Sequence, residues 1–339
     1  MANIFPGIFV PLAVAILAML LASTDFIQNT LHFSSLILAI LIGVIIGNIF
    51  KFPESFKPGI TFALKKILRI AIVFLGFRLT FQNIIEVGLI GLIVDTIMLT
   101  GTFLLGIWVS KRIFGLDDKM SYLISSGSSI CGASAVLATA PVVKAEMHYA
   151  AMAVATVTIF GTISMFIYPI IYKAGLLPGF NDILYGIWVG ASVHEVAQVV
   201  AAGFAISEPA GNTATIAKLT RVMMLAPLLI ILSFYLAKKQ ATHGAGTTLK
   251  DIPIPYFVFG FIAMVGINSL NVIPSHVVST INYIDGFLLT VAMAAMGMET
   301  NINKVKGVGM KPIYAAAVLF MFLLVGGVIV VKLVHNILA

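Results

Sequence analysis

Apolar runs of about 20 residues recur along this chain, and they constrain its fold more than any other feature of the sequence. A run of that length can cross the hydrocarbon core of a bilayer as an α-helix, because the helix satisfies its own backbone polar groups. Only 10% of the 339 residues are charged, whereas soluble domains carry about 25%. No stretch remains that is long enough for a soluble domain, so the sequence predicts an all-α, polytopic membrane protein.

Eleven membrane-spanning segments with short connections are predicted from these runs. They cover residues 7–22, 32–50, 60–80, 88–110, 121–142, 148–172, 182–205, 213–236, 253–269, 276–299 and 311–336. With a cytoplasmic N-terminus, all but five of the 20 Lys and Arg residues fall on the cytoplasmic side. The exceptions are Arg78, Lys144, Lys218, Arg221 and Lys332. This asymmetry predicts a multi-pass protein of the cell inner (plasma) membrane, with its N-terminus in the cytoplasm and its C-terminus outside.

Several function classes are excluded by what the sequence lacks. The net charge of +7 is spread over short loops and forms no patch, so we expect the lipid bilayer and no nucleic acid as a partner. There is no P-loop, metal constellation or nucleophile elbow, which predicts neither an enzyme nor a bound cofactor or metal. The single cysteine, Cys131, cannot form an intrachain disulfide. The oligomeric state is not fixed by the sequence, which is compatible with a homodimer.

The fifth segment contains two glycines and five serines in the ten residues from Ser125 to Ser134. Such a composition disfavours a regular helix, and loose backbone in a membrane is tolerated only inside protein or along a cavity. A break would create a half-helix whose free N–H groups attract anions. The alternative is a small-residue face for close helix packing. The substrate-binding residues predicted here are Ser128, Ser129, Cys131, Gly132 and Ser134.

The seventh segment carries ionisable groups at membrane depth, where they are rare and usually functional. His194 and Gln198 are four residues apart and Glu195 lies between them, so on a helix these groups can share one face. The second histidine of a zinc motif is absent. We predict that His194 and Gln198 bind substrate and that Glu195 couples a proton or ion. A polar clamp between helices is the alternative.

The eighth segment places two cations, Lys218 and Arg221, three residues apart on one side of a helix. Buried cations require counter-charges. In the functional interpretation they bind an anion, with Arg221 offering a planar fork to an oxyanion and Lys218 a point charge. In the structural interpretation they pair with Glu195 and extend toward the outer surface.

Three further charges lie within predicted segments. Asp95 stands in the middle of an apolar segment and is predicted to pair with a cation or to carry a coupled proton. Arg78 and Glu299 are predicted to be structural or gating charges. They fall opposite each other when residues 69–88 are compared with 290–309 at an offset of 221 residues, a pattern that favours an inverted repeat.

Four motifs resemble the family of proposed sulfate exporters of the YeiH type. They are Leu-Gly-Phe-Arg-Leu at 75–79, Ser-Ile-Cys-Gly-Ala-Ser at 129–134, Gly-Ala-Ser-Val-His-Glu-Val-Ala-Gln-Val-Val-Ala-Ala-Gly at 190–203, and Lys-Leu-Thr-Arg at 218–221. The similarity extends over essentially the whole chain. That family is grouped with the sodium/proton antiporters and bile-acid symporters, which implies inverted repeats, broken crossing helices, and core and panel domains.

On this scheme, residues 1–31 form an extra N-terminal helix, 32–173 the first repeat and 181–339 the second, all within one transporter unit. The fifth and tenth segments are then the broken, crossing pair. The offset of 221 residues instead pairs the third segment with the tenth, so the expected fold rests on the resemblance and not on that repeat. The expected function is a secondary transporter, acting as an exporter, for a small inorganic or sulfonate-type anion such as sulfate or sulfite, with H⁺ or Na⁺ as coupling ion. The alternative is a cation/proton antiporter that uses Asp95, Glu195 and Glu299.

Overall fold

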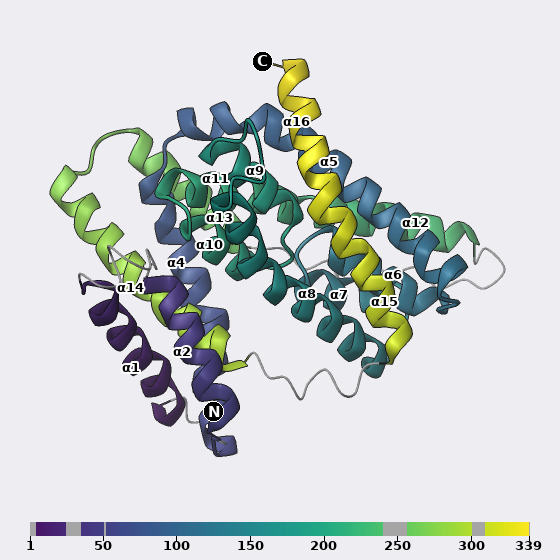
Figure 1. Ribbon diagram of the computed structural model, residues 1–339, viewed down its shortest axis with the longest axis horizontal. Coiled ribbons are helices and arrows are strands. Elements are labelled where there is room, and N and C mark those ends of the chain that lie inside the picture. The colour runs from purple at the N-terminus through teal and green to yellow at the C-terminus, as the bar shows by residue number, and fades with distance from the viewer. Residues whose placement is uncertain (1–4, 25–34, 51, 240–255, 300–308, 339) are drawn as a thin grey trace. The chain divides into compact units, whose positions relative to one another are not determined.

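The computed structural model describes residues 5–24, 35–50, 52–239, 256–299 and 309–338, and this part of the chain folds into helices joined by loops, with no strand (Figure 1). Five of the described helices are long and apolar enough to cross a membrane, and shorter apolar helices accompany them. Each of the eleven predicted segments coincides with helical structure, which confirms the all-α membrane fold. The chain divides into two compact units.

The first unit comprises Met1–Glu86, Phe204–Glu208 and Tyr256–Asn303. Its helical elements are α1 (Phe5–Ala22), α2 (Ser35–Ile49), η2 (Glu54–Phe56), α3 (Lys57–Phe62), η3 (Ala63–Ile67), α4 (Leu68–Leu75), η4 (Gly76–Arg78), α13 (Tyr256–Ser269) and α14 (Ser275–Glu299).

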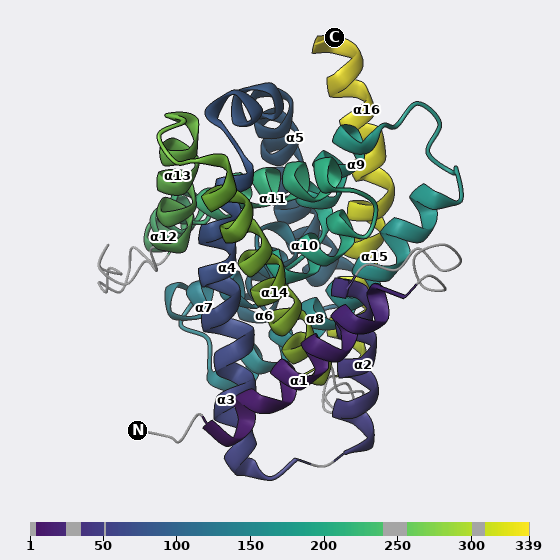
Figure 2. The same cartoon turned by 90° about the vertical axis from the view of Figure 1, so that its left-hand side faces the viewer.

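Glycines allow α2 and α14 of this unit to pack with their backbones in contact (Figure 2). A Cβ atom at Gly43 would overlap the carbonyl oxygen of Ala294, and one at Gly297 would overlap that of Ile40. Small residues serve this purpose in membranes because lipid chains are as apolar as leucine and close packing must supply the attraction. Part of the apolar core of the unit is formed by Ala15, Ile60, Ala63, Ile67, Val291, Ala295 and Met298.

The second unit comprises Val87–Gly203, Pro209–Pro255 and Lys304–Ala339. Three of its helices have one end in the first unit, namely α5 (Phe81–Trp108), α10 (Val196–Phe204) and α11 (Glu208–Met223). Its other helical elements are η5 (Val109–Ile113), α6 (Asp118–Ser129), α7 (Ala133–Val142), α8 (Met147–Lys173), α9 (Asp182–Ser192), α12 (Leu225–Lys239), α15 (Met310–Met321), η8 (Phe322–Gly326) and α16 (Gly327–Leu338).

The fifth predicted segment is broken between α6 and α7, as its serines and glycines predicted, and it folds back on itself. Asp117, which caps α6, bonds to Tyr149 near the start of α8. Ten residues further along α6, the space beside Gly127 is bounded by Val157 of α8 and Val136 of α7. Since α6 runs parallel to α8 and α7 returns to the start of α8, the two half-helices form a hairpin whose turn is residues 130–132.

The seventh predicted segment forms a second hairpin, from α9 and α10, on the other half of α8. Trp188 of α9 stacks on Tyr168 of α8 with ring centroids 4.1 Å apart. The Tyr185 hydroxyl donates to the carbonyl oxygen of Ala202 at 3.0 Å, which a single helix could not allow across 17 residues. The open ends of the hairpins therefore lie at opposite ends of α8, and their turns approach each other near its middle.

Two expectations are wrong in detail. His194 and Gln198 do not share the face of one continuous helix, because α9 ends at Ser192 and α10 begins only at Val196. The tenth segment is not broken, because α14 is one continuous helix, so the fifth and tenth segments are not a pair of broken helices. Of the compared repeat, Asn303 and Val308 lie outside the described residues, as do four basic residues of the charge count, Lys51, Lys250, Lys304 and Lys306.

Candidate functional site

The turns of the two hairpins meet at Lys218, in α11. Its Nζ atom donates one hydrogen bond to the carbonyl oxygen of Ile130 at 2.5 Å and another to that of Val193 at 2.7 Å. Ile130 and Val193 are the residues that directly follow α6 and α9. Because Lys218 is fully buried, one ammonium group joins both hairpins in the interior of the second unit.

Arg221, one helical turn further along α11, binds the first hairpin alone. Its Nε atom donates to the carbonyl oxygen of Ser129 at 2.5 Å. The side chain is fully buried, and its two terminal nitrogens, Nη1 and Nη2, have no hydrogen-bond partner in the part of the chain that the structure describes. An unpaired buried guanidinium is costly, so the outer edge of this fork is the strongest indication of a ligand in the unit.

The backbone explains part of this positive charge. α6 and α9 end at the Lys218 site, and a helix C-terminus carries about half a negative charge and unsatisfied carbonyl groups. Lys218 therefore acts as a shared C-terminal cap for two half-helices, and the Nε atom of Arg221 does the same for α6. Among the described residues no ion pair within 4 Å joins Glu195 to either cation, although Glu195 interacts electrostatically with Lys218 over a longer distance.

Glu195 lies instead at the N-terminal end of α7. A Cβ atom at Gly132, the N-cap of α7, would be 2.6 Å from Cγ of Glu195 and 3.3 Å from its Oε1 atom. The backbone N–H of Ala133 bonds to the carboxylate, and the Thr158 hydroxyl of α8 donates to its Oε1 atom at 3.5 Å. A carboxylate at a helix N-terminus satisfies free N–H groups and the helix dipole.

Other predicted substrate-binding residues surround the turns. Both ring nitrogens of His194, the hydroxyl of Ser128 and the amide nitrogen of Gln198 are buried and have no hydrogen-bond partner among the described residues. The oxygen of the Gln198 amide accepts the backbone N–H of Glu195 at 3.0 Å. Cys131 is buried as a free thiol at the first turn. Ser134 differs from the others, since it is exposed on the first helical turn of α7.

Asp95 belongs to the same unit, on α5. Its side chain is fully buried and interacts electrostatically with Arg221 and Lys218, and neither carboxylate oxygen has a hydrogen-bond partner within the described ranges. No ion pair within 4 Å joins Asp95 to a described cation. Asp95 is therefore close enough to offset part of the positive charge without closing the fork of Arg221.

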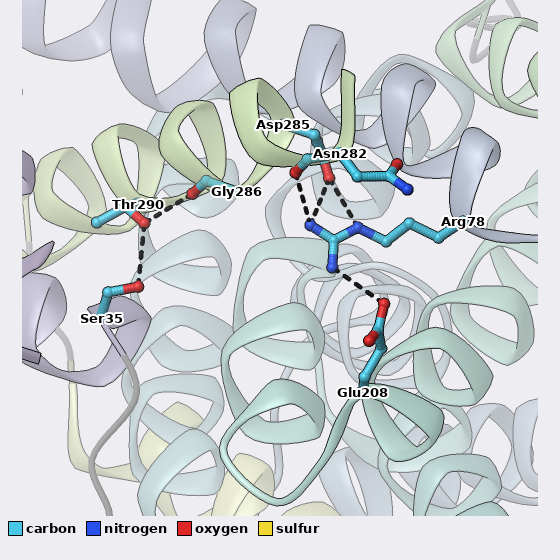
Figure 3. A network of polar contacts seen from close by, with 7 residues as sticks. All are labelled: Ser35, Arg78, Glu208, Asn282, Asp285, Gly286 and Thr290. Carbon is cyan, nitrogen blue, oxygen red and sulfur yellow. Dashed lines mark hydrogen bonds and ion pairs between the residues drawn. The ribbon is translucent and has the colours of Figure 1, made fainter. Parts of the chain in front are cut away.

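Arg78 belongs to the first unit and is fully engaged there (Figure 3). Its Nε and Nη2 atoms each lie 3.2 Å from Oδ2 of buried Asp285, and Nη1 lies 3.4 Å from Oε1 of Glu208. Nη2 also donates to the carbonyl oxygen of Asn282 at 3.2 Å, and the guanidinium lies 5.6 Å from the ring of Phe204. Glu299 is the last residue of α14.

Sequence reasoning missed residues that position the second hairpin. Thr158 resembles many other helical threonines, and nothing in the sequence marks it as a partner of Glu195. Trp188 donates from Nε1 to the carbonyl oxygen of Leu324 at 3.1 Å, inside the π-helical turn η8. A π-turn shifts carbonyls out of the regular helical ladder, so this bond fixes α9 to the last helix. Among the described residues there is no group of three metal-binding side chains.

Comparison with known proteins gives consistent relatives over nearly the full length. The family model described as Conserved hypothetical protein 698 matches residues 6–316. The UPF0324 inner membrane protein YeiH of Escherichia coli (strain K12) is 47% identical over 311 residues, which cover 91% of this chain and 88% of that protein. The UPF0324 membrane protein PA5383 of Pseudomonas aeruginosa is 43% identical over 331 residues, which cover 96% of this chain and 93% of that protein. No solved structure matches.

Proposed function

We propose that this chain, which belongs to the family of conserved hypothetical protein 698, the UPF0324 membrane proteins, is a secondary transporter that exports a small anion. The substrate class is an inorganic or sulfonate-type oxyanion such as sulfate or sulfite. The observation that carries the proposal is the buried guanidinium of Arg221, whose two terminal nitrogens have no partner. Such a fork matches the geometry of an oxyanion.

The surroundings of Arg221 support an oxyanion further. Among the described residues, the groups left without a partner near the hairpin turns include two further donors, the Ser128 hydroxyl and the Gln198 amide nitrogen. Donors in a water-poor interior favour a ligand with several acceptor oxygens. Broken helices with unsatisfied ends near the membrane centre are the usual site of secondary transporters.

The two hairpins also provide a physical basis for alternating access. They reach the same buried ammonium group from opposite ends of α8, so opening either hairpin would expose the site to one side only. If neither hairpin crosses the membrane, Lys144 is assigned to the cytoplasmic side and Lys173 to the outer side, the reverse of the assignment from eleven crossing segments. The basic residues are then as unequally divided as before, which supports the same orientation, with a cytoplasmic N-terminus and an outside C-terminus.

A second candidate function is a cation/proton antiporter, and one observation favours it. Both carboxylate oxygens of buried Asp95 lack a partner, and acceptor-only groups of this kind bind Na⁺ or a proton. In that case Lys218 and Arg221 hold the hairpins together and balance the carboxylate when no cation is bound. Asp95 would also serve as the coupling residue of an anion transporter, so the two functions differ in which ion is required.

Counterflow in vesicles tests the proposal. Purified protein is placed in liposomes loaded with unlabelled sulfate or sulfite, and uptake of the labelled anion is followed, with Arg221→Gln as the test variant. Arg112→Gln is the matched control, because Arg112 belongs to the same unit and is exposed. We expect uptake by the wild type and the control and none by Arg221→Gln. Cation-dependent proton movement with no anion requirement would instead support the antiporter.

A further inference from the structure

The N-terminal end of α7 is the half-helix end that the sequence predicts to attract an anion, and an anionic group already lies there. It is the carboxylate of Glu195, which reaches across from the turn of the other hairpin. α7 has ten residues, and its N-cap, Gly132, has no side chain to satisfy the free N–H groups. The Ala133 N–H and the Thr158 hydroxyl both bond to the carboxylate.

The local geometry is specific for this contact. Gly132 has a backbone φ of +67° and leaves room for the side chain, because a Cβ atom there would approach Cγ of Glu195 to 2.6 Å. The Gln198 amide oxygen accepts the backbone N–H of Glu195 at 3.0 Å and so fixes the start of the side chain. The carboxylate therefore has a backbone anchor, a hydroxyl partner and a helix end, although it has no cation within 4 Å among the described residues.

An independent observation indicates that a free anion also binds at this turn. Arg221 is held against the turn through its bond to Ser129, and its two terminal nitrogens remain unpartnered in a fully buried side chain. The Ser128 hydroxyl, 2% exposed, is also without a partner. The first hairpin therefore offers donors for an oxyanion beyond those that Glu195 uses.

We propose that Glu195 is a tethered anion that competes with the transported oxyanion for the N-terminal end of α7. This inference rests on the proposed anion-transport function. An oxyanion that enters the first hairpin turn displaces the carboxylate from Gly132, and the carboxylate returns when the oxyanion leaves. The hairpin contact between Glu195 and Gly132 thus holds the two turns together only while the site is empty of substrate.

Competition of this kind lowers the apparent affinity for the substrate. The apparent dissociation constant equals the intrinsic one divided by the fraction of protein in which the site is open. If Glu195 covers the site about nine-tenths of the time, its removal strengthens binding about tenfold. A variant that only weakens the tether should raise the open fraction by less than removal of Glu195 does. Such a variant leaves the charge of the site unchanged.

The test measures sulfate and sulfite affinity of the purified full-length protein by calorimetry in three variants. Glu195→Gln removes the charge and should strengthen binding about tenfold. Thr158→Val removes only the hydroxyl tether and should strengthen binding about threefold. Thr156→Val is the matched control, because Thr156 lies on the same helix and its hydroxyl bonds to the Ala153 carbonyl of α8 itself. We expect no change in this control.

The outcomes separate this inference from the proposed function. If no variant binds either anion, the proposed function fails and the competition fails with it. If the wild type binds an anion and both Glu195→Gln and Thr158→Val bind it no more tightly, the competition is overturned while the transport function stands. Tighter binding in Glu195→Gln alone would reflect the lost charge and would also overturn the tether. Where Glu195→Gln does not fold, Thr158→Val against Thr156→Val decides.

Discussion

Arg78 in the first unit and Arg221 in the second are both arginines in a membrane protein, yet their surroundings are opposite. Arg78 has two carboxylates beside it, one of them from fully buried Asp285 (Figure 3), and an aromatic ring also lies against it. Arg221 has one backbone carbonyl, and its terminal nitrogens have no partner. The comparison separates a charge whose role is complete within the fold from a charge that leaves donors for a ligand.

Lys218 stands between these two cases. It is satisfied like Arg78, but by the carbonyl oxygens at two helix ends and not by carboxylates. Helix ends thus stabilise the cations of the second unit without neutralising them, since a helix dipole contributes only about half a charge. Asp95 and Glu195 offset part of this charge through space, so the hydrogen-bond donors left at the turns are the feature that favours an anion.

The largest effect is expected from Arg78→Met. The substitution leaves Asp285 buried without its cation, and breaking a buried ion pair costs about 3–5 kcal/mol. Denaturant or thermal unfolding in detergent measures the loss. The double variant Arg78→Met/Asp285→Asn should recover most of the stability, because no uncompensated charge remains. If the double variant is as unstable as Arg78→Met, the loss of stability does not come from leaving the Asp285 carboxylate without its cation.

Lys218→Met should cause the next largest loss of stability. It removes two hydrogen bonds from a charged donor, each worth about 1.5–3 kcal/mol, and leaves two buried carbonyls without partners. We expect a loss of roughly 3 kcal/mol in the same unfolding measurement. Because the partners are carbonyls, adding Asp95→Asn should not restore stability. Recovery of stability in that double variant would mean that Lys218 is paired mainly with a carboxylate, as Arg78 is. The contrast between the two cations would then be wrong.

Arg221→Lys should act on the ligand more than on the fold. Lysine keeps the charge and one donor for the Ser129 carbonyl, but it lacks the planar fork. We expect sulfate or sulfite affinity to fall about tenfold, which is about 1.4 kcal/mol, while unfolding without anion stays close to the wild type. Affinity equal to the wild type would mean that the fork is not used.

Glu208→Gln should have the smallest effect. The Glu208 side chain is 63% exposed and its oxygen lies 3.4 Å from Nη1 of Arg78, and exposed pairs contribute about 0–1 kcal/mol. Unfolding should therefore be nearly unchanged, in contrast with Arg78→Met. A loss comparable to that of Arg78→Met would place the stabilising charge on Glu208 and not on Asp285.

Much of this arrangement could be predicted from the sequence. Apolar runs located all eleven segments, because membrane helices must satisfy their own backbone. The Ser and Gly content of the fifth segment predicted its break, since those residues disfavour a helix. Lys218 and Arg221 were recognised as buried cations because charge is rare at that depth.

The remaining features depend on tertiary contacts. The composition indicates that the helix breaks but not in which direction the chain continues, so the return of α7 along α6 could not be predicted. The second turn, residues 193–195, contains no glycine or proline that would mark it in the sequence. Helical spacing therefore wrongly predicted that His194 and Gln198 share one helix face. The position of Glu195 depends on Gly132, 63 residues earlier in the chain, and on Thr158. Nothing in the sequence around Thr158 distinguishes it from other threonines in helices.

Anion-dependent stabilisation tests most directly whether the second unit binds an oxyanion through Arg221. The melting temperature of the purified protein is measured with sulfate, sulfite and chloride, for the wild type, Arg221→Gln and the matched control Arg112→Gln. A ligand at about 100 times its dissociation constant stabilises the native state by about 2.7 kcal/mol. We predict that one oxyanion stabilises the wild type and Arg112→Gln and has no effect on Arg221→Gln. Equal stabilisation of all three, or of none, would contradict the account.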